Sequence, residues 1–204
     1  MMKSAILASL IATAAAFAPA QQAASTTALN SFETELGVQP PIGFWDPLGL
    51  LNGASQAKFD RLRYVEIKHG RVCMLAVVGQ LVTRAGIHMP GIIDLNGDKF
   101  SDYPNGVGAI TPETGIPKEG LASIALFIGF LELFVMKSYP DRGNEFPGDF
   151  RNGALDWGWS DFTDEQKLQK RAIELNNGRA AMMGILGLMV HEQLGVALPV
   201  VGDM

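Results

Sequence analysis

The sequence is short of charged residues and of cysteine, and each shortage excludes a class of protein. Asp, Glu, Lys and Arg make up 18% of the 204 residues, whereas soluble domains carry about 25%. The net charge of −5 gives no general basic field, so nucleic acid is not an expected partner. Cys73 is the single cysteine, which excludes an internal disulfide. The hydrophobic share of 48% instead favours a small membrane protein with polar loops.

Long uninterrupted apolar runs are also scarce. Three segments are candidate membrane spans, at residues 57–85, 119–138 and 164–193, and only the second approaches the roughly 18 apolar residues of a plain span. The first and third reach that length only if the polar segments 66–71 and 174–179 also lie in or near the membrane. We therefore predict an all-α membrane protein with three transmembrane helices, and a soluble helical bundle remains an alternative on length alone.

The first 30 residues are predicted to be a targeting presequence rather than part of the fold. A positive start and an apolar stretch at 5–16, too short to span a bilayer, resemble a signal peptide. The alanine- and hydroxyl-rich segment that follows lacks acids, as transit peptides do. This order indicates import in two steps, with residues 31–204 forming the mature domain.

Basic residues are distributed unevenly around the three spans. Four precede the first apolar centre and six lie between the second and third, whereas the loop 86–118 holds only Lys99 and Lys118. Because Lys and Arg stay on the untranslocated side, the first and third helices should begin on one side of the membrane and the loop 86–118 should face the other.

The most informative feature is an internal repeat with an offset of 108 residues. The segment R-Y-V-E-I-K-H-G-R-V-C-M from residue 63 aligns with R-A-I-E-L-N-N-G-R-A-A-M from residue 171. Each copy places one glutamate and one arginine at the start of an apolar helix, and ionisable groups there are costly and tend to be functional. We predict that the first and third helices cross as a pseudo-two-fold pair. Small residues would allow a close approach at 70, 76, 79, 178, 181, 184 and 187.

The crossing predicts two exchanged ion pairs. Glu66 and Arg71 are five residues apart, roughly 140° around a helix, so they are poorly placed to pair with each other. In a two-fold crossing, Arg71 reaches Glu174 and Arg179 reaches Glu66. One oxygen of each glutamate would then accept from an arginine, while the other faces outward.

The donor atoms predicted to face away from the crossing suit a metal ion that already has most of its ligands. His69 follows Glu66 by three residues, and Asn177 occupies the matching position in the second copy. Glu, His and Asn each offer a lone pair to a hard cation such as magnesium. One side chain per metal is too few for a bare ion but sufficient when a tetrapyrrole supplies four ligands. Further candidate ligands inside the apolar segments are Gln80, Glu132 and His191. His88, in the turn after the first span, is interpreted as solvated.

These two helices resemble the signature helices of the chlorophyll-binding light-harvesting antenna family. G-F-W-D-P-L-G-L at 43–50 resembles the segment that precedes the first such helix, and L-D-W-G-W at 155–159 is a degenerate second copy. With A-F-A-P at 16–19, typical of plastid presequences, the chain is most similar to the fucoxanthin chlorophyll a/c proteins of diatoms and related algae.

The resemblance implies a pigment set and a set of sites. Axial ligands to chlorophyll magnesium fall on Glu66, His69, Glu132, Glu174, Asn177 and His191, and Gln80 would ligate a pigment particular to this branch. Arg71 and Arg179 match the ion-pair partners, and carotenoid ends lie near Asp46 and Asp156. The implied cofactors are chlorophyll a, chlorophyll c and fucoxanthin, with diadinoxanthin as a further candidate.

The family also implies a place and partners. The expected location is the plastid thylakoid membrane, multi-pass, with the first and third helices starting at the stroma. The partners would be other antenna subunits in a homo- or hetero-oligomer, photosystem I or II or both, and thylakoid lipids. Two departures from the plant pattern stand out: Ile124 replaces a glutamine ligand, and no histidine follows the third span.

Three other functions remain open. A photoprotective member of the same family would quench energy and sense pH through loop carboxylates at Asp94, Asp98, Asp102, Glu113 and Glu119. A di-iron carboxylate enzyme needs two E-x-x-H motifs, and here the second copy is E-x-x-N. A transporter is disfavoured because three helices leave little room for a pathway. We expect no enzymatic activity, since no nucleophile–base set or phosphate loop is present.

Overall fold

The computed structural model describes residues 32–93, 96–111, 114–137, 144–154 and 156–195. The predicted presequence, residues 1–30, lies outside these ranges, and so do Asp94, Glu113 and Ser138. The chain forms two compact units, one up to Gln56 and one from Ala57 onward, and each is considered by itself.

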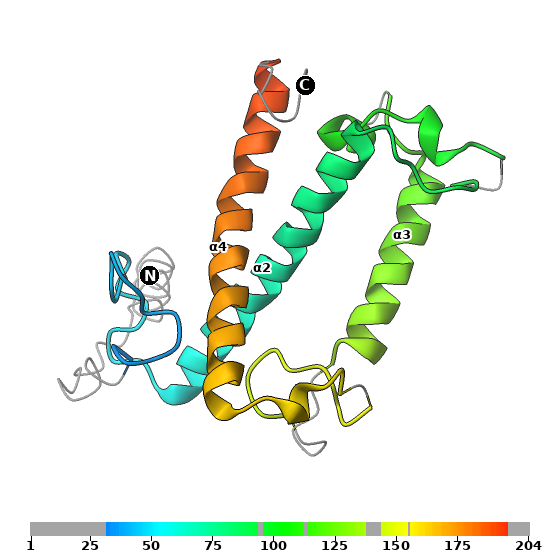
Figure 1. The fold of residues 1–204 in the computed structure, drawn as a ribbon. Helices are drawn as coiled ribbons and strands as arrows, with labels where there is room; N and C mark the ends of the chain where they lie inside the picture. Colours follow the sequence, from blue (N-terminus) through cyan, green and yellow to red (C-terminus); the bar gives the residue numbers. More distant parts are fainter. Residues whose placement is uncertain (1–31, 94–95, 112–113, 138–143, 155, 196–204) are drawn as a thin grey trace, which may run out of the picture. The chain divides into compact units, whose positions relative to one another are not determined.

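Three long helical segments are present in the described chain, as the sequence predicts (Figure 1). Helix α2 spans Gln56–Arg84, α3 spans Lys118–Phe130 and α4 spans Asp164–Leu194. The π-helical turn η4, Leu131–Val135, continues α3. Short 3₁₀ turns lie between the helices: η2 at Phe100–Asp102, η3 at Gly106–Ile110 and η6 at Trp159–Asp161.

Local capping explains where α4 begins and ends. Thr163 is the N-cap: its hydroxyl accepts from the Gln166 backbone N–H, and the Gln166 side chain accepts from the Thr163 N–H. This reciprocal pair satisfies two helix-end donors. At the other end Gly195 adopts φ 64°, the left-handed conformation that terminates many helices. Gly86, with φ 78°, follows the end of α2 in the same way.

Helices α2 and α4 cross, and their closest point is a contact between two glycines. A Cβ atom added at Gly70 would lie 2.9 Å from the Gly178 Cα, and one added at Gly178 would lie 3.0 Å from the Gly70 Cα. The two glycines are equivalent in the 108-residue repeat, so the pseudo-two-fold axis passes between them.

The expectation that Gly79 and Gly187 also lie at the contact is wrong. A Cβ atom at either position would have nothing within 4 Å, and one at Gly184 would only reach Val77 at 3.9 Å. The physical reason is the crossing itself, because helices that cross at an angle separate on moving away from the crossing point.

The helices leave much apolar surface uncovered. Among the described residues only Phe32, Ala54, Phe59, Ile67 and Leu175 form the buried apolar set, whereas Leu75, Leu126 and Met183 are each more than 70% exposed. Exposed apolar side chains in this number are unusual for a soluble monomer when they lie together. None of the described helices combines the length and the apolar character that crossing a membrane requires.

Candidate functional site

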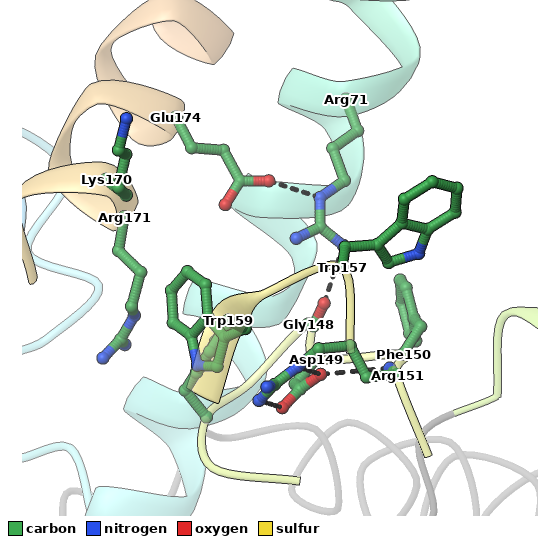
Figure 2. Close-up of a pocket in the computed structure, with 11 residues that line it drawn as sticks. Arg71, Gly148, Asp149, Phe150, Arg151, Trp157, Trp159, Lys170, Arg171 and Glu174 are labelled. Atoms are coloured by element: carbon green, nitrogen blue, oxygen red, sulfur yellow. Dashed lines mark hydrogen bonds and ion pairs between the residues drawn. The ribbon is translucent and has the colours of Figure 1, made fainter. Parts of the chain in front are cut away.

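Both exchanged ion pairs are present at the crossing of α2 and α4. Arg71 Nε donates to Glu174 Oε1 at 2.6 Å, and Arg179 Nε donates to Glu66 Oε1 at 2.7 Å. Figure 2 shows the first pair, with the Arg71 guanidinium reaching across from α2 to the α4 carboxylate. Charge-assisted bonds of this length are the strong class of hydrogen bond, so the two pairs fix the register of the crossing.

The two halves differ at a second pair of equivalent arginines. Arg63 donates to Glu66 Oε2 at 2.8 Å, so both oxygens of Glu66 take a guanidinium. Arg171, its counterpart, instead places its guanidinium 4.3 Å from the centre of the Phe146 ring. The expectation that one oxygen of Glu66 faces outward is therefore wrong, since the i, i+3 spacing of Arg63 and Glu66 brings them together.

A cavity of about 380 Å³ lies beside the first ion pair, between the helices and loop residues within 146–151 and 157–159 (Figure 2). Arg71 forms one wall and also donates from Nη1 to the Gly148 carbonyl at 2.6 Å. Its guanidinium lies 5.4 Å from the Phe150 ring centre. Aromatic and cationic side chains from the loop and α4 complete the lining, among them Phe146, Trp157, Trp159, Lys170 and Arg171.

The buried carboxylate of Asp149 holds together the loop residues that line this cavity. Asp149 is 3% exposed and accepts from Arg151 Nε at 2.9 Å, from Arg151 Nη2 at 2.5 Å and from the Glu145 backbone N–H at 3.1 Å. Burial raises the pKa of Asp149, but the hydrogen bonds from Arg151 and Glu145 outweigh it and hold the pKa below its ordinary value. The same contacts raise the pKa of Arg151. Nearby, a hydrogen bond from Trp159 lowers the pKa of Glu145.

The two histidines singled out in the sequence are held in the same way. His69 Nδ1 lies 2.8 Å from the Val65 carbonyl, and His191 Nδ1 lies 2.7 Å from the Gly187 carbonyl. A carbonyl only accepts, so in each bond Nδ1 carries a proton. In the neutral form of the ring, the remaining nitrogen, Nε2, has the lone pair that a metal ligand needs. Asn177, the counterpart of His69, is exposed on α4.

Glu132 lies in the π turn η4 and forms an ion pair with Lys68 of α2. The pair involves Oε2, and it ties the second helical segment to the crossed pair. The sequence did not indicate Lys68, because nothing in the repeat says which face of α2 meets the second span. π turns occur often at functional sites.

Gln80 is buried and contacts α4 through a residue that sequence reasoning missed. Its Nε2 donates to Glu192 Oε2 at 3.0 Å, and Arg84 Nη2 lies 3.3 Å from the same oxygen. The other oxygen of Glu192 accepts from the backbone N–H groups of Val107 at 2.7 Å and Gly108 at 3.2 Å, in η3. A signal was available: Arg84 and Glu192 are 108 residues apart, so they occupy equivalent positions of the repeat with opposite charge.

Asp46 and Asp156 each close a turn of their own segment. Asp46 Oδ1 accepts from the Leu50 N–H at 3.0 Å, and Asp156 Oδ1 accepts from the Ser160 N–H at 3.2 Å. Both bonds span four residues, which matches the prediction that the second segment is a degenerate copy of the first.

His88 lies in the wall of a second cavity, beside the end of α2, so the interpretation of His88 as simply solvated is incomplete. The loop acids Asp98 and Asp102 bond locally, to Tyr103 and to the Lys99 N–H.

The structure thus brings together Glu66, Arg71, Glu174 and Arg179 and spreads the other candidate donors over separate positions. In the described part of the chain, no three His, Cys, Asp or Glu residues gather into a group that could hold a bare metal ion. Among the described residues, the candidate donors therefore do not form a cluster of the kind that binds a bare metal ion.

Comparison with known proteins decides the family. Residues 32–193 match the chlorophyll a-b binding protein family. The chain belongs to this family. It is 63% identical over 204 residues, the whole of both chains, to a chloroplastic fucoxanthin-chlorophyll a-c binding protein of Trieres chinensis.

Other relatives extend the same result. Fucoxanthin-chlorophyll a-c binding protein A of Phaeodactylum tricornutum is 59% identical over 199 residues, covering 97% of this chain and 99% of the relative. Protein B of Macrocystis pyrifera is 49% identical over 216 residues, covering 100% of this chain and 96% of the relative. The family predicted from the sequence is confirmed, and the di-iron enzyme alternative is wrong because these proteins bind pigments and are not enzymes.

Proposed function

We propose that this chain is a light-harvesting antenna protein that binds chlorophyll a, chlorophyll c and fucoxanthin, with diadinoxanthin as a further carotenoid. The observation that carries the proposal is identity at 63% over the full length of a fucoxanthin-chlorophyll a-c binding protein. The arrangement of donors agrees with it, since no three His, Cys, Asp or Glu residues gather in the described chain, and a magnesium held by a tetrapyrrole needs only one axial ligand.

The chemistry of the donor set fits chlorophyll. His69 and His191 would present Nε2, and Asn177 its side-chain oxygen. Glu174 would use the carboxylate oxygen that does not accept from Arg71, and Glu132 the one that does not accept from Lys68. Glu66 has a guanidinium on each oxygen, but a carboxylate oxygen has two lone pairs, so a ligand role is retained. Gln80 would use its amide oxygen.

The role of the protein is to hold the pigments at fixed positions. The glycine contact and the two exchanged ion pairs make the α2–α4 crossing rigid, so ligands on these two helices keep constant mutual distances. Bound chlorophyll would supply light absorption and the dipole coupling through which excitation energy moves. Carotenoid ends would lie near Asp46 and Asp156, whose turns fix the segments that precede α2 and α4.

We further propose a thylakoid location with the starts of α2 and α4 at the stroma. The uncovered apolar side chains on all three helices support a lipid and pigment environment, and the uneven distribution of Lys and Arg supports the orientation. Residues 1–30 would be the plastid presequence and 31–204 the antenna domain. The partners would be other antenna subunits, photosystem I or II or both, and thylakoid lipids.

The test is the absorption spectrum and extracted pigment content of the purified protein. Excitation of fucoxanthin should produce chlorophyll a fluorescence, which shows transfer within one complex. Absence of chlorophyll would overturn the proposal. A short fluorescence lifetime that appears at pH 5 but not at pH 7 would favour the photoprotective alternative.

Neighbouring asparagines provide a matched test of one ligand. Asn176 and Asn177 are both exposed on α4. Asn177→Ala should lose one chlorophyll per protein, and Asn176→Ala should keep it. Equal pigment content in the two variants would remove Asn177 from the ligand set.

A further inference from the structure

We infer that Glu192 is a positioning residue that orients the Gln80 amide, so that its oxygen serves as the axial ligand of a magnesium tetrapyrrole in the cavity beside the end of α2. The inference rests on the proposed pigment function. It concerns two residues and one cavity that the family resemblance leaves unconnected.

The orientation follows from which atoms can donate. A carboxylate only accepts, so the group of Gln80 that faces Glu192 at 3.0 Å is the NH₂ group. The amide oxygen therefore points to the other side. Gln80 is 9% exposed and is one of the residues that line the cavity beside the end of α2. The contact with Glu192 therefore fixes the amide plane of a side chain that borders this cavity.

Glu192 is itself held firmly enough to set that plane. Its carboxylate accepts from four donors, Gln80 and Arg84 on α2 and two backbone N–H groups of η3. Its side chain is 12% exposed and that of Arg84 is 11% exposed. A Cβ atom at Gly106 would overlap the carboxylate, and its φ of 70° favours glycine, so this position leaves room for the carboxylate. A carboxylate in this setting has little freedom to turn.

The cavity next to Gln80 is suited to a ligand. It measures about 450 Å³, within the range of small-molecule sites. Its lining is largely apolar and includes Ala76, Gly79, Phe100, Tyr103 and Ala109. Ala76 and Gly79 lie one turn and one residue before Gln80, and nothing comes within 4 Å of a Cβ atom at Gly79. The small side chains on this part of α2 therefore leave space next to the ligand oxygen, where a flat ring needs room.

Ligand residues of metals usually rely on a neighbour that fixes their orientation, and Glu192 supplies that contact to Gln80. It also ties η3, which forms part of the cavity wall, to α4. Replacement of Glu192 by glutamine keeps the size of the side chain but removes the constraint, because an amide both donates and accepts.

The experiment compares four variants, each purified with its pigments. Gln80→Leu should lose one chlorophyll per protein and one band of the low-temperature chlorophyll absorption spectrum. Glu192→Gln should weaken or lose the same band. The double variant Q80H/E192Q should regain it, because imidazole ligates without an amide to orient. Glu119→Gln, the same change at an exposed acid at the start of α3, should keep it.

The outcomes separate this inference from the antenna function. A full pigment complement in Gln80→Leu would overturn the ligand role, and an unchanged band in Glu192→Gln would overturn the positioning role. Failure of Q80H/E192Q to regain the band, or to assemble at all, would show that Glu192 acts only by holding the loop, which also overturns the inference. In each case the wild type keeps its chlorophyll, whereas a wild type without chlorophyll would contradict the function itself.

Discussion

Gly70 of α2 and Gly178 of α4 touch backbone to backbone, and each is the counterpart of the other in the repeat. This contact, with an ion pair on either side, defines the axis about which the candidate ligands are placed. Because the two backbones are already in contact, an added side-chain atom at either glycine would force the helices to shift.

Gly178→Ala should destabilise the protein, although alanine normally favours a helix. The added methyl would lie 3.0 Å from the Gly70 Cα, and backbone cannot move aside as a flexible side chain can. Overpacking of this kind costs about 1–3 kcal/mol. Gly187→Ala on the same helix meets nothing within 4 Å and should be neutral or stabilising. The temperature at which helical circular dichroism is lost measures both, and equal midpoints would argue against the tight crossing.

Glu66→Gln should be more harmful than Glu174→Gln. Loss of the Glu66 charge weakens bonds from two guanidiniums, Arg63 and Arg179, whereas loss of the Glu174 charge weakens one, from Arg71. A hydrogen bond to a charged group contributes about 1.5–3 kcal/mol, and Arg71 still donates to the Gly148 carbonyl. Yield of assembled protein and its thermal midpoint test the order, and the reverse order would contradict the asymmetry.

Exchange of Lys68 and Glu132 should separate two roles of Glu132. Lys68→Glu places two carboxylates together and should loosen the second helical segment from α2. The double variant K68E/E132K restores an opposite-charge pair and should recover the thermal midpoint. It should not recover the chlorophyll assigned to Glu132, because a lysine ammonium has no lone pair. A double variant no more stable than Lys68→Glu would show that the ion pair does not join the segments.

Acid should loosen the segment 144–152 only at low pH. The pKa of Asp149 in the folded protein lies below its ordinary value. The Asp149 carboxylate therefore contributes its full stabilisation when the pH is above the ordinary pKa, and this stabilisation is lost as the pH falls through the folded pKa. The transition therefore lies below about pH 4. Trp159 reports it by fluorescence, since Arg151 lies 5.1 Å from its ring centre. Asp149→Asn should remove this step, and an unchanged acid transition in that variant would assign it to another group.

Much of the helical architecture was predictable because local signals and the repeat agreed. The predicted third span, 164–193, agrees with α4, Asp164–Leu194, to within one residue. The exchanged pairs followed from the offset alone, since a two-fold crossing brings Arg71 to Glu174 and Arg179 to Glu66. Family membership followed from the same residues.

The remaining contacts depend on how separate segments pack. The ion pair of Lys68 with Glu132 requires knowledge of which face of α2 meets η4, and no periodicity supplies it. The error at Gly79 and Gly187 arose from treating a crossing as if the helices ran parallel. Glu192 was overlooked because it lies among polar residues at the end of α4, where a charge needs no explanation.

Arg84 and Glu192 lie 3.3 Å apart at positions that the repeat makes equivalent. Two identical subunits related by a true two-fold axis would bring like charge against like charge there, arginine to arginine or glutamate to glutamate. A single continuous polypeptide escapes that restriction, because each copy can change independently of the other. A chain that holds both copies can therefore have an attraction on the symmetry axis that no homodimer of either half could have.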